Sequence, residues 1–471
     1  MPIDRSSAGR ALAAALALLL VTSLARADIP PLGPPVVPPS VHRPTAIGAL
    51  SGAHPLLRFH GAVTNPTPLP LVNDPIPIVC AAECREFTFR ATRGAPFLVG
   101  IHSTVRGPNG AFNPNDGFVM YLYGPSGRLV ASAVGIGADG QAVTVDAAAP
   151  GKYTIVVTFT YAQDPDAAYD GEVRLMRGPT WQRAPCTQTR VGGVTGCFAL
   201  PALLALPAYD LAVSGLPPVA STPIGFPLPL VPGTPTSCYA DETFGLTSPS
   251  ADQLRHPTTR CLRFTSTVRN VGAGTLEVRL PWLAADGRSG FVPGQCRAEQ
   301  VVSTVTGVQA TRPAGPCEFH PAHAHFHYKD LVSYSLYTAG LGRQLGSSTK
   351  ESFCLADDEY FGFGTAGPNG PRNYVGQPGC NVPAESGPDG LYVAEGVTPG
   401  WGDVYTWDTP DQFIDITNVR PGTYDLVIKT NPTGALLVAG PAQTCSLRRL
   451  VLTAHAVRSG STQASIPCPS A

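Results

Sequence analysis

Glycine and proline set the strongest limit on the fold of this chain of 471 residues, because there are 50 of each. Both residues are unfavourable inside helices and mark the turns between short strands. Segments such as 86–90, 153–159 and 262–270 alternate apolar and polar residues, which is the period of a half-buried strand. Charged residues make up 14% of the chain, little more than half the usual share. We therefore expect a mainly β protein, with more than one domain at this length.

The charge balance argues against nucleic acid as a partner. The formal net charge is −1, and no stripe of Lys and Arg stands out along the chain. Proteins that bind nucleic acid carry such basic patches.

The N-terminus has the composition of a signal peptide. Arg5 and Arg10 precede an apolar run over 11–24, and Ala25-Arg26-Ala27 follows it. A basic start, a short apolar core and a small-x-small site are typical of a leader that is cleaved, here near Ala27. A membrane span needs about 20 apolar residues, more than this run or any later one supplies. We expect a secreted or periplasmic protein without a membrane span.

The twelve cysteines are an even number, which favours disulfides in an oxidising compartment. Pairing by proximity in the sequence is one of many possible connectivities. It predicts the bonds Cys80–Cys84, Cys186–Cys197, Cys238–Cys261, Cys296–Cys317, Cys354–Cys380 and Cys445–Cys468.

Composition divides the mature chain into four parts. A Pro-rich linker covers 28–48, and short alternating runs with turn signals over 49–178 predict an accessory β-sandwich. This module is similar to the β-sandwich domains attached to secreted bacterial enzymes, and its expected role is binding or spacing. A second linker, rich in Pro and Ala, covers 179–206, and the remainder, 207–471, is again mostly β in pattern.

Four of the ten histidines lie within eight residues: His320, His323, His325 and His327. Side chains alternate along a strand, so the last three share one face. Their ends lie about 13 Å apart on a flat strand, so the strand must bend for all three to reach one ion. Three imidazoles suit zinc, copper or nickel and leave coordination positions open, as in catalytic metal sites. His320 breaks the alternation, and we expect it close to the metal without being a ligand.

Downstream residues resemble the catalytic domain of lysyl oxidases. The histidine run fits that family's His-x-x-His-x-His-x-His signature, and Lys350 stands just before Ser-Phe-Cys-Leu at 352–355. Asp403-Val404-Tyr405 is then followed, eight residues later, by Ile-Asp-Ile-Thr at 414–417. The resemblance covers roughly 207–435.

The resemblance implies a copper-dependent amine oxidase. His323, His325 and His327 would be the copper ligands, while Lys350 and Tyr405 would form the cross-linked cofactor lysine tyrosylquinone. Such an enzyme converts a primary amine, either peptidyl lysine or a small amine, to an aldehyde. Molecular oxygen is the acceptor, and hydrogen peroxide and ammonia are released. Asp403 is the candidate base that accepts the substrate proton.

The chain departs from the family pattern at several positions, and two other functions remain open. Phe319 replaces the family's Trp, Tyr334 stands where animal members have a His, and residues 439–445 replace an acidic segment. A secreted copper-binding or matrix protein would keep the metal without the quinone. A zinc hydrolase could use the same three histidines, although no Glu base lies in the run.

Overall fold

The computed structural model describes residues 44–64, 84–92, 94–104, 116–134, 140–145, 148–162, 166–176, 185–214, 238, 260–281, 296–320, 325–348, 353–362, 374, 380, 385–387, 390–405, 407 and 412–469. These residues form strands and connecting turns, with no α-helix among them, so the predicted mainly β fold is confirmed. None of the described segments is therefore a helix able to cross a bilayer. The predicted signal peptide, 1–27, lies outside the described residues.

The first nine strands make two sheets with a shared core, as predicted for the accessory β-sandwich. One sheet has the strand order β1-β3-β8-β5-β6 and the other β2-β9-β4-β7. Aromatic side chains fill the space between them, with Phe89, Phe97 and Tyr153 in mutual ring contact at 5.0–5.3 Å. The strands are β1 (Thr45–Leu50), β2 (Leu56–Thr64), β3 (Arg85–Ala91), β4 (Phe97–Ser103), β5 (Asp116–Tyr123), β6 (Leu129–Val134), β7 (Gly140–Val145), β8 (Gly151–Ala162) and β9 (Asp166–Leu175).

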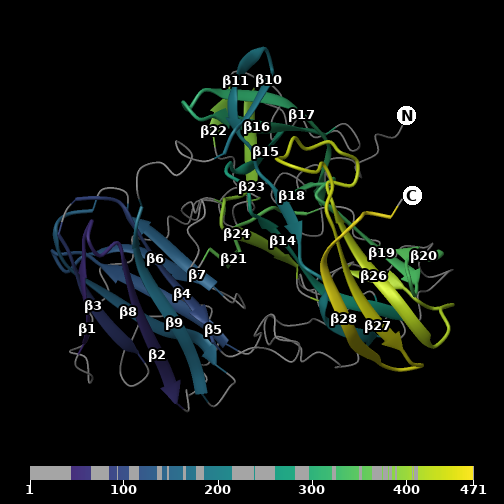
Figure 1. Ribbon diagram of the computed structural model, residues 1–471, viewed down its shortest axis with the longest axis horizontal. Coiled ribbons are helices and arrows are strands. Elements are labelled where there is room, and N and C mark those ends of the chain that lie inside the picture. The colour runs from purple at the N-terminus through teal and green to yellow at the C-terminus, as the bar shows by residue number, and fades with distance from the viewer. Residues whose placement is uncertain are drawn as a thin grey trace, which may run out of the picture. The chain divides into compact units, whose positions relative to one another are not determined.

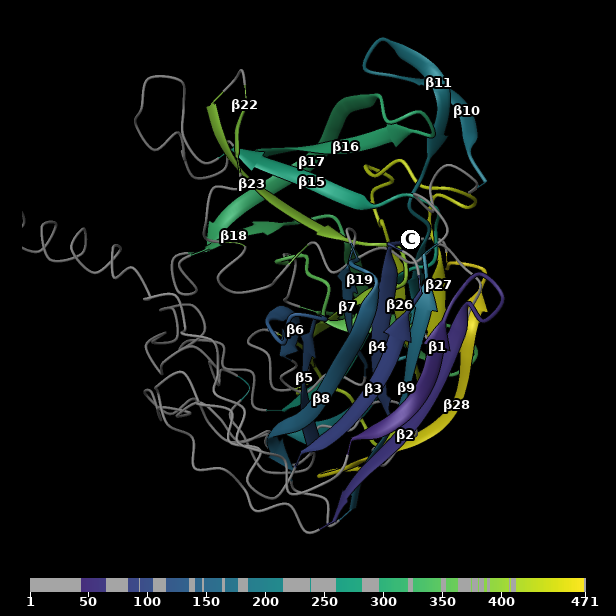
Figure 2. The same cartoon turned by 90° about the vertical axis from the view of Figure 1, so that its left-hand side faces the viewer.

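The remaining strands form three further sheets, and Figure 1 labels most of their strands. Figure 2 shows β15, β16, β17 and β23 of the largest of them side by side. The strands are β10 (Thr187–Val191), β11 (Val194–Ala199), β12 (Leu203–Ala205), β13 (Tyr209–Ser214), β14 (Cys261–Asn270), β15 (Leu276–Pro281), β16 (Arg297–Thr304), β17 (Gln309–His320), β18 (His325–Tyr328), β19 (Val332–Thr338), β20 (Gln344–Ser347), β21 (Glu359–Tyr360), β22 (Glu385–Gly387), β23 (Gly390–Val397), β24 (Trp401–Tyr405), β25 (Phe413–Asp415), β26 (Gly422–Thr430), β27 (Cys445–Leu452) and β28 (Val457–Ile466).

Strand β14 organises this second part of the chain. It pairs with β12, β13, β24 and β25, and nearly all of its residues are buried. Its one buried cation, Arg263, donates to the carbonyl oxygens of Trp407 and Cys238 at 3.3 and 3.1 Å. Because these carbonyls accept from both terminal nitrogens of the guanidinium, a charged side chain is tolerated inside the core. The pairing with β24 fixes the backbone that carries Asp403 and Tyr405.

The range 179–206 differs from the linker predicted for it. It contains β10, β11 and β12, which pair with one another or with β16 and β14. Leu200, Leu203 and Ala205 are buried there. Prolines and alanines in this stretch suggested a tether, but its apolar residues are covered by strands distant in the sequence. The first strand, β1, likewise begins at Thr45, inside the range assigned to the Pro-rich linker.

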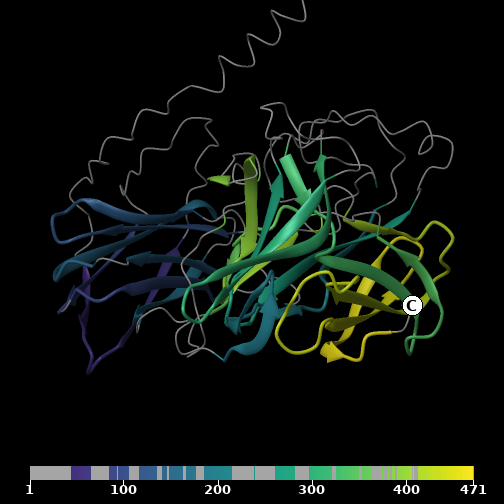
Figure 3. The same ribbon diagram turned by 90° about the horizontal axis from the view of Figure 1, so that it is seen from above.

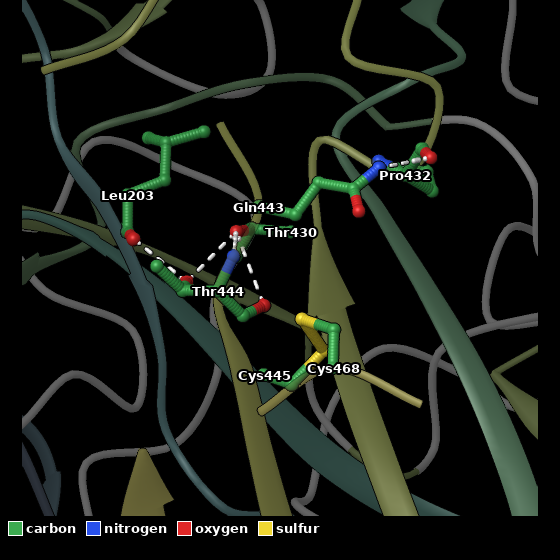
Figure 4. Close-up of a disulfide and its surroundings, with 7 residues drawn as sticks. All are labelled: Leu203, Thr430, Pro432, Gln443, Thr444, Cys445 and Cys468. Atoms are coloured by element: carbon green, nitrogen blue, oxygen red, sulfur yellow. Dashed lines mark hydrogen bonds between the residues drawn. A yellow bond between two sulfur atoms is a disulfide. The ribbon is translucent and has the colours of Figure 1, made fainter. Parts of the chain in front are cut away.

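The C-terminal strands β26, β27 and β28 lie side by side in Figure 3, in the yellow part of the chain. Residues just before β27 connect this sheet to its surroundings (Figure 4). Thr444 donates its hydroxyl to the carbonyl of Leu203 and bonds Thr430, while Gln443 donates to the carbonyl of Pro432. The segment 439–445, where the chain departs from the family pattern, therefore still leads into a regular sheet.

Disulfide bonds cross-link the part of the chain that follows β9. The predicted bonds Cys186–Cys197, Cys238–Cys261, Cys296–Cys317, Cys354–Cys380 and Cys445–Cys468 are all present. Cys84 is also disulfide-bonded, and its predicted partner, Cys80, lies outside the described residues. Each loop of this size contributes about 3 kcal/mol in the chain-entropy model.

Candidate active site

The histidine run forms one end of a β-hairpin. Strand β17 ends at His320 and β18 begins at His325, and these two residues lie directly opposite each other. The last histidine, His327, is opposite Glu318 and only 3% exposed. His323 lies outside the described residues, as do the side chains of His320 and His325. The described side chains contain no group of three metal-binding residues, so the predicted ligand set stays a prediction.

The strand that carries His327 is joined to the segment that follows Lys350. The backbone N–H groups of Tyr328 and Phe353 each donate to the other's carbonyl oxygen at 2.8 Å. The Tyr328 hydroxyl also donates to the carbonyl of Ala314 at 2.7 Å, which fixes the hairpin strand from its other side. Lys350 itself lies outside the described residues.

Tyr405 reaches this junction from β24. Its hydroxyl donates to the carbonyl oxygen of Cys354 at 2.7 Å, and its ring meets Phe353 edge-on at 5.0 Å. Phe353 is bridged to Tyr328, the residue that follows His327, so Tyr405 and the histidine hairpin contact the same short segment. Burial first, and then the nearby carboxyls of Asp403 and Asp358, raise the pKa of Tyr405 well above its usual value.

Asp403 lies two residues before Tyr405 on the same strand and is buried, with 1% of its surface exposed. Residues two apart on a strand share a face. Its Oδ1 accepts a long hydrogen bond of 3.4 Å from the N–H of Ala356, and Oδ2 has no donor within reach among the described residues. Burial, followed by the Asp358 carboxyl, raises the pKa of Asp403 well above its usual value.

Sequence reasoning missed a second buried acid, Glu395 on β23. Its Oε2 accepts the N–H of Leu355 at 3.2 Å, and its Oε1 has no donor within reach in the described parts of the chain. Burial raises the pKa of Glu395 well above its usual value, although backbone N–H groups oppose the shift. The sequence signal that could have identified Glu395 was its place at an inward-facing position of a strand with alternating apolar residues.

Tyr334, which stands where animal members have a His, is part of the same buried surroundings. Its hydroxyl forms a hydrogen bond of 2.7 Å with Ser266 Oγ, which also accepts the Gln412 amide at 3.1 Å. Its ring meets that of Phe353 edge-on at 6.2 Å. A neutral hydroxyl therefore occupies a position where the family has an ionisable imidazole.

These features define a class: a disulfide-linked β protein in which a histidine hairpin and a partly buried tyrosine contact one segment beside buried acids. Residues 384–440 match the family model described as lysyl oxidase. These matches agree with the resemblance to the lysyl oxidase family that the motifs predicted.

Relatives match only part of the chain. Lysyl oxidase homolog 1 of Homo sapiens is 34% identical over 122 residues, which are 26% of this chain and 18% of that protein. Protein-lysine 6-oxidase of Sus scrofa is 33% identical over 125 residues, or 26% and 42% of the two chains. Lysyl oxidase homolog 3A of Danio rerio is 26% identical over 196 residues, 41% of this chain and 20% of that one. The chain thus spans less than half the length of each.

Among solved structures, the pre-peptidase C-terminal domain of a collagenase from Bacillus anthracis covers 29% of this chain and 98% of that domain. Its sequence identity is 15% and its TM-score 0.19, which is too low to assign a shared fold.

Proposed function

We propose that this protein is a secreted, copper-dependent amine oxidase that deaminates primary amines, either peptidyl lysine or small amines. In this proposal His323, His325 and His327 bind the copper, and Lys350 and Tyr405 form the quinone. Asp403 takes part in removing the substrate proton.

One observation carries the proposal: the hydrogen bond from the Tyr405 hydroxyl to the carbonyl of Cys354. The preceding residue, Phe353, is bridged to Tyr328 on β18, so the predicted oxidisable ring contacts the segment that adjoins the strand with two of the predicted ligands. A tyrosine with a purely structural role could make this hydrogen bond without a histidine hairpin nearby. Oxidation of the Tyr405 ring by a bound copper ion would require the ring to lie near the histidines.

The position of Lys350 in the sequence is compatible with a cross-link. Three peptide units separate it from Phe353, whose ring contacts Tyr405. Three residues span at most about 11 Å of chain, and a Lys side chain adds further reach. The length of this connection therefore permits the Lys350 amine to reach the Tyr405 ring.

The donor set fits copper. Imidazole nitrogens suit Cu(II), which leads the divalent affinity order at such sites. When bound, the copper and the quinone supply the oxidising chemistry that turns an amine into an aldehyde, with oxygen as acceptor. The residues of the chain position the ring and transfer protons. Phe353 and the carbonyl of Cys354 hold the Tyr405 ring in place, and the buried acids accept and donate protons.

The five disulfides support an oxidising compartment, since such bonds are rare in the cytosol. Secretion or transfer to the periplasm would supply that compartment.

The test is peroxide release from lysine-rich peptides and alkylamines by the mature protein loaded with copper. Lys350→Ala and Tyr405→Phe are each expected to abolish turnover and quinone absorbance while leaving copper bound. Tyr424→Phe is the matched control, because the Tyr424 hydroxyl also donates to a backbone carbonyl, that of Arg420, at 2.6 Å. It should keep the quinone.

Other outcomes point to the other functions. Copper without quinone absorbance, and without a Lys350–Tyr405 cross-link by mass spectrometry, would indicate a copper-binding or matrix protein. Zinc in the purified protein together with hydrolytic activity would indicate a hydrolase. Full activity in Tyr405→Phe would contradict the cofactor assignment.

A further inference from the structure

Three acids follow one another at 357–359, and they have very different surroundings. Asp357 is fully hydrogen-bonded: the N–H and hydroxyl of Thr398 each donate to it at 2.7 Å, and the N–H of Tyr374 at 3.1 Å. Glu359 is paired with Arg269 at 2.6 Å. These two acids have the donors that a structural carboxylate requires.

Asp358, between them, lies against Asp403. Glu359 pairs with Gly402 and Tyr360 with Trp401, and the carboxyl of Asp358 lies close enough to that of Asp403 to raise its pKa. The N–H of Asp358 donates to the carbonyl of Gly402 at 3.0 Å, and its Oδ2 accepts the N–H of Val404 at 3.2 Å. Asp358 therefore bonds the backbone of β24 at Gly402 and at Val404, the two residues that flank Asp403.

Two carboxylates that lie close together repel, which disfavours the charged form of both. Asp403 is 1% exposed, and its Oδ2 has no donor among the described residues. A buried carboxylate in that position costs several kcal/mol unless a proton removes its charge. A proton on Asp403 solves both problems at once, because it neutralises the buried group and supplies a donor to Asp358.

We propose that Asp403 and Asp358 share one proton and together form a two-carboxyl relay for the substrate proton. This inference rests on the amine oxidase function proposed above. Asp358 is the terminal acceptor because it is less buried than Asp403.

The step balances in protons and charge. The carbon–hydrogen bond of the substrate breaks and its proton goes to one oxygen of Asp403. The proton already on Asp403 passes to Asp358, which changes from carboxylate to carboxylic acid. The pair's single negative charge is lost, and Asp403 ends the step protonated, as it began.

The groups that face Asp403 agree with this arrangement. Besides Asp358 they are Glu395 on β23, Tyr405 and Tyr334. Among the described residues, the N–H of Ala356 is the donor that reaches Asp403. The carboxyls of Asp358 and Glu395 raise the pKa of Asp403 beyond the effect of burial. No Lys or Arg of the described residues forms an ion pair with it.

The first test uses infrared difference spectra of the full mature chain without copper, recorded as a function of pH. The wild type should show a buried carboxylic-acid band that Asp403→Asn removes. In Asp358→Asn this band should disappear at a lower pH, because the neighbouring charge that favours the protonated form is gone. Glu395→Gln is the matched control: it removes the other buried acid and should leave the Asp403 band in place.

The second test is turnover with an α-deuterated amine. Asp358→Asn should lower kcat by about 10- to 100-fold, a smaller loss than that for the first acceptor, and increase the deuterium isotope effect. Asp358→Glu, which restores a carboxyl, should recover part of the rate.

An unchanged band titration in Asp358→Asn would overturn the shared proton, and an unchanged kcat would overturn the relay. A wild-type chain that oxidises no amine would overturn the proposed function and the relay with it. The infrared band would still decide whether the two carboxyls share a proton.

Discussion

Two buried aspartates of this protein, Asp425 and Asp403, have the same side chain and opposite surroundings. Asp425, on β26, accepts hydrogen bonds from Arg449 at 2.8 and 3.1 Å and from the N–H groups of Gly340 and Leu341 at 2.6 and 3.1 Å. Asp403, on β24, accepts one long hydrogen bond, from the N–H of Ala356 at 3.4 Å. Both are almost completely inaccessible to water.

The pKa values respond to this difference. Burial raises the pKa of Asp425, but the hydrogen bonds from Arg449, Leu341 and Gly340 outweigh it and the net pKa is lowered. For Asp403 the opposing hydrogen bond is too weak, and the pKa stays raised. A fold keeps a carboxyl in such poor surroundings at a cost in stability, and active sites are where that cost is usually found. The comparison thus separates a structural acid from one that we assign to chemistry.

The largest expected effect is on turnover. Asp403→Asn should reduce kcat for amine oxidation by about 100-fold or more, because a positioned general base contributes 10²–10⁴. Its melting temperature should stay equal or rise, since the amide has no charge to bury. Peroxide release and thermal unfolding measure the two quantities, and a strongly destabilised Asp403→Asn with normal turnover would reverse the assignment.

The next effect is on stability. Asp425→Asn should lower the free energy of unfolding by about 2 kcal/mol, within the range for a lost charged hydrogen bond. Solvent screening limits the loss, because the Arg449 side chain is 41% exposed. Turnover by the folded protein should be unchanged. Urea unfolding compares this variant with the wild type, and equal midpoints would show that the Arg449 pair contributes nothing.

The smallest effect is on the pH dependence of stability, where the two acids should act in opposite directions. The folded pKa of Asp425 is lowered, so its contribution is present above the unfolded pKa, about 3.9, and is lost as pH falls through the folded value. The folded pKa of Asp403 is raised, so its contribution is present below about pH 3.9 and is lost as pH rises through the folded value. Urea unfolding from about pH 3 to about pH 8 should show Asp425→Asn flatter at the acid end and Asp403→Asn flatter above it. Identical profiles in the two variants would contradict the comparison.

Much of the fold could be predicted from local patterns. The alternation over 86–90, 153–159 and 262–270 became β3, β8 and β14, and proximity along the chain predicted five disulfides. Composition misjudged 179–206, because a Pro- and Ala-rich stretch can be a strand when partners from elsewhere cover it. The assignment of His323, His325 and His327 as ligands stays a prediction.

The sequence by itself determined the residue types of the site and their order: a histidine run, a Lys before Phe-Cys, and Asp-x-Tyr. These depend on covalent spacing, which no fold can alter. Only the tertiary structure decided which carboxyl lies against which. Asp357, Asp358 and Glu359 look alike in the sequence, but of the three it is Asp358 that bonds the backbone on either side of Asp403 and whose carboxyl raises the pKa of Asp403. This placement depends on hydrogen bonds between segments about 45 residues apart, and the same contacts determine which acids lack a donor.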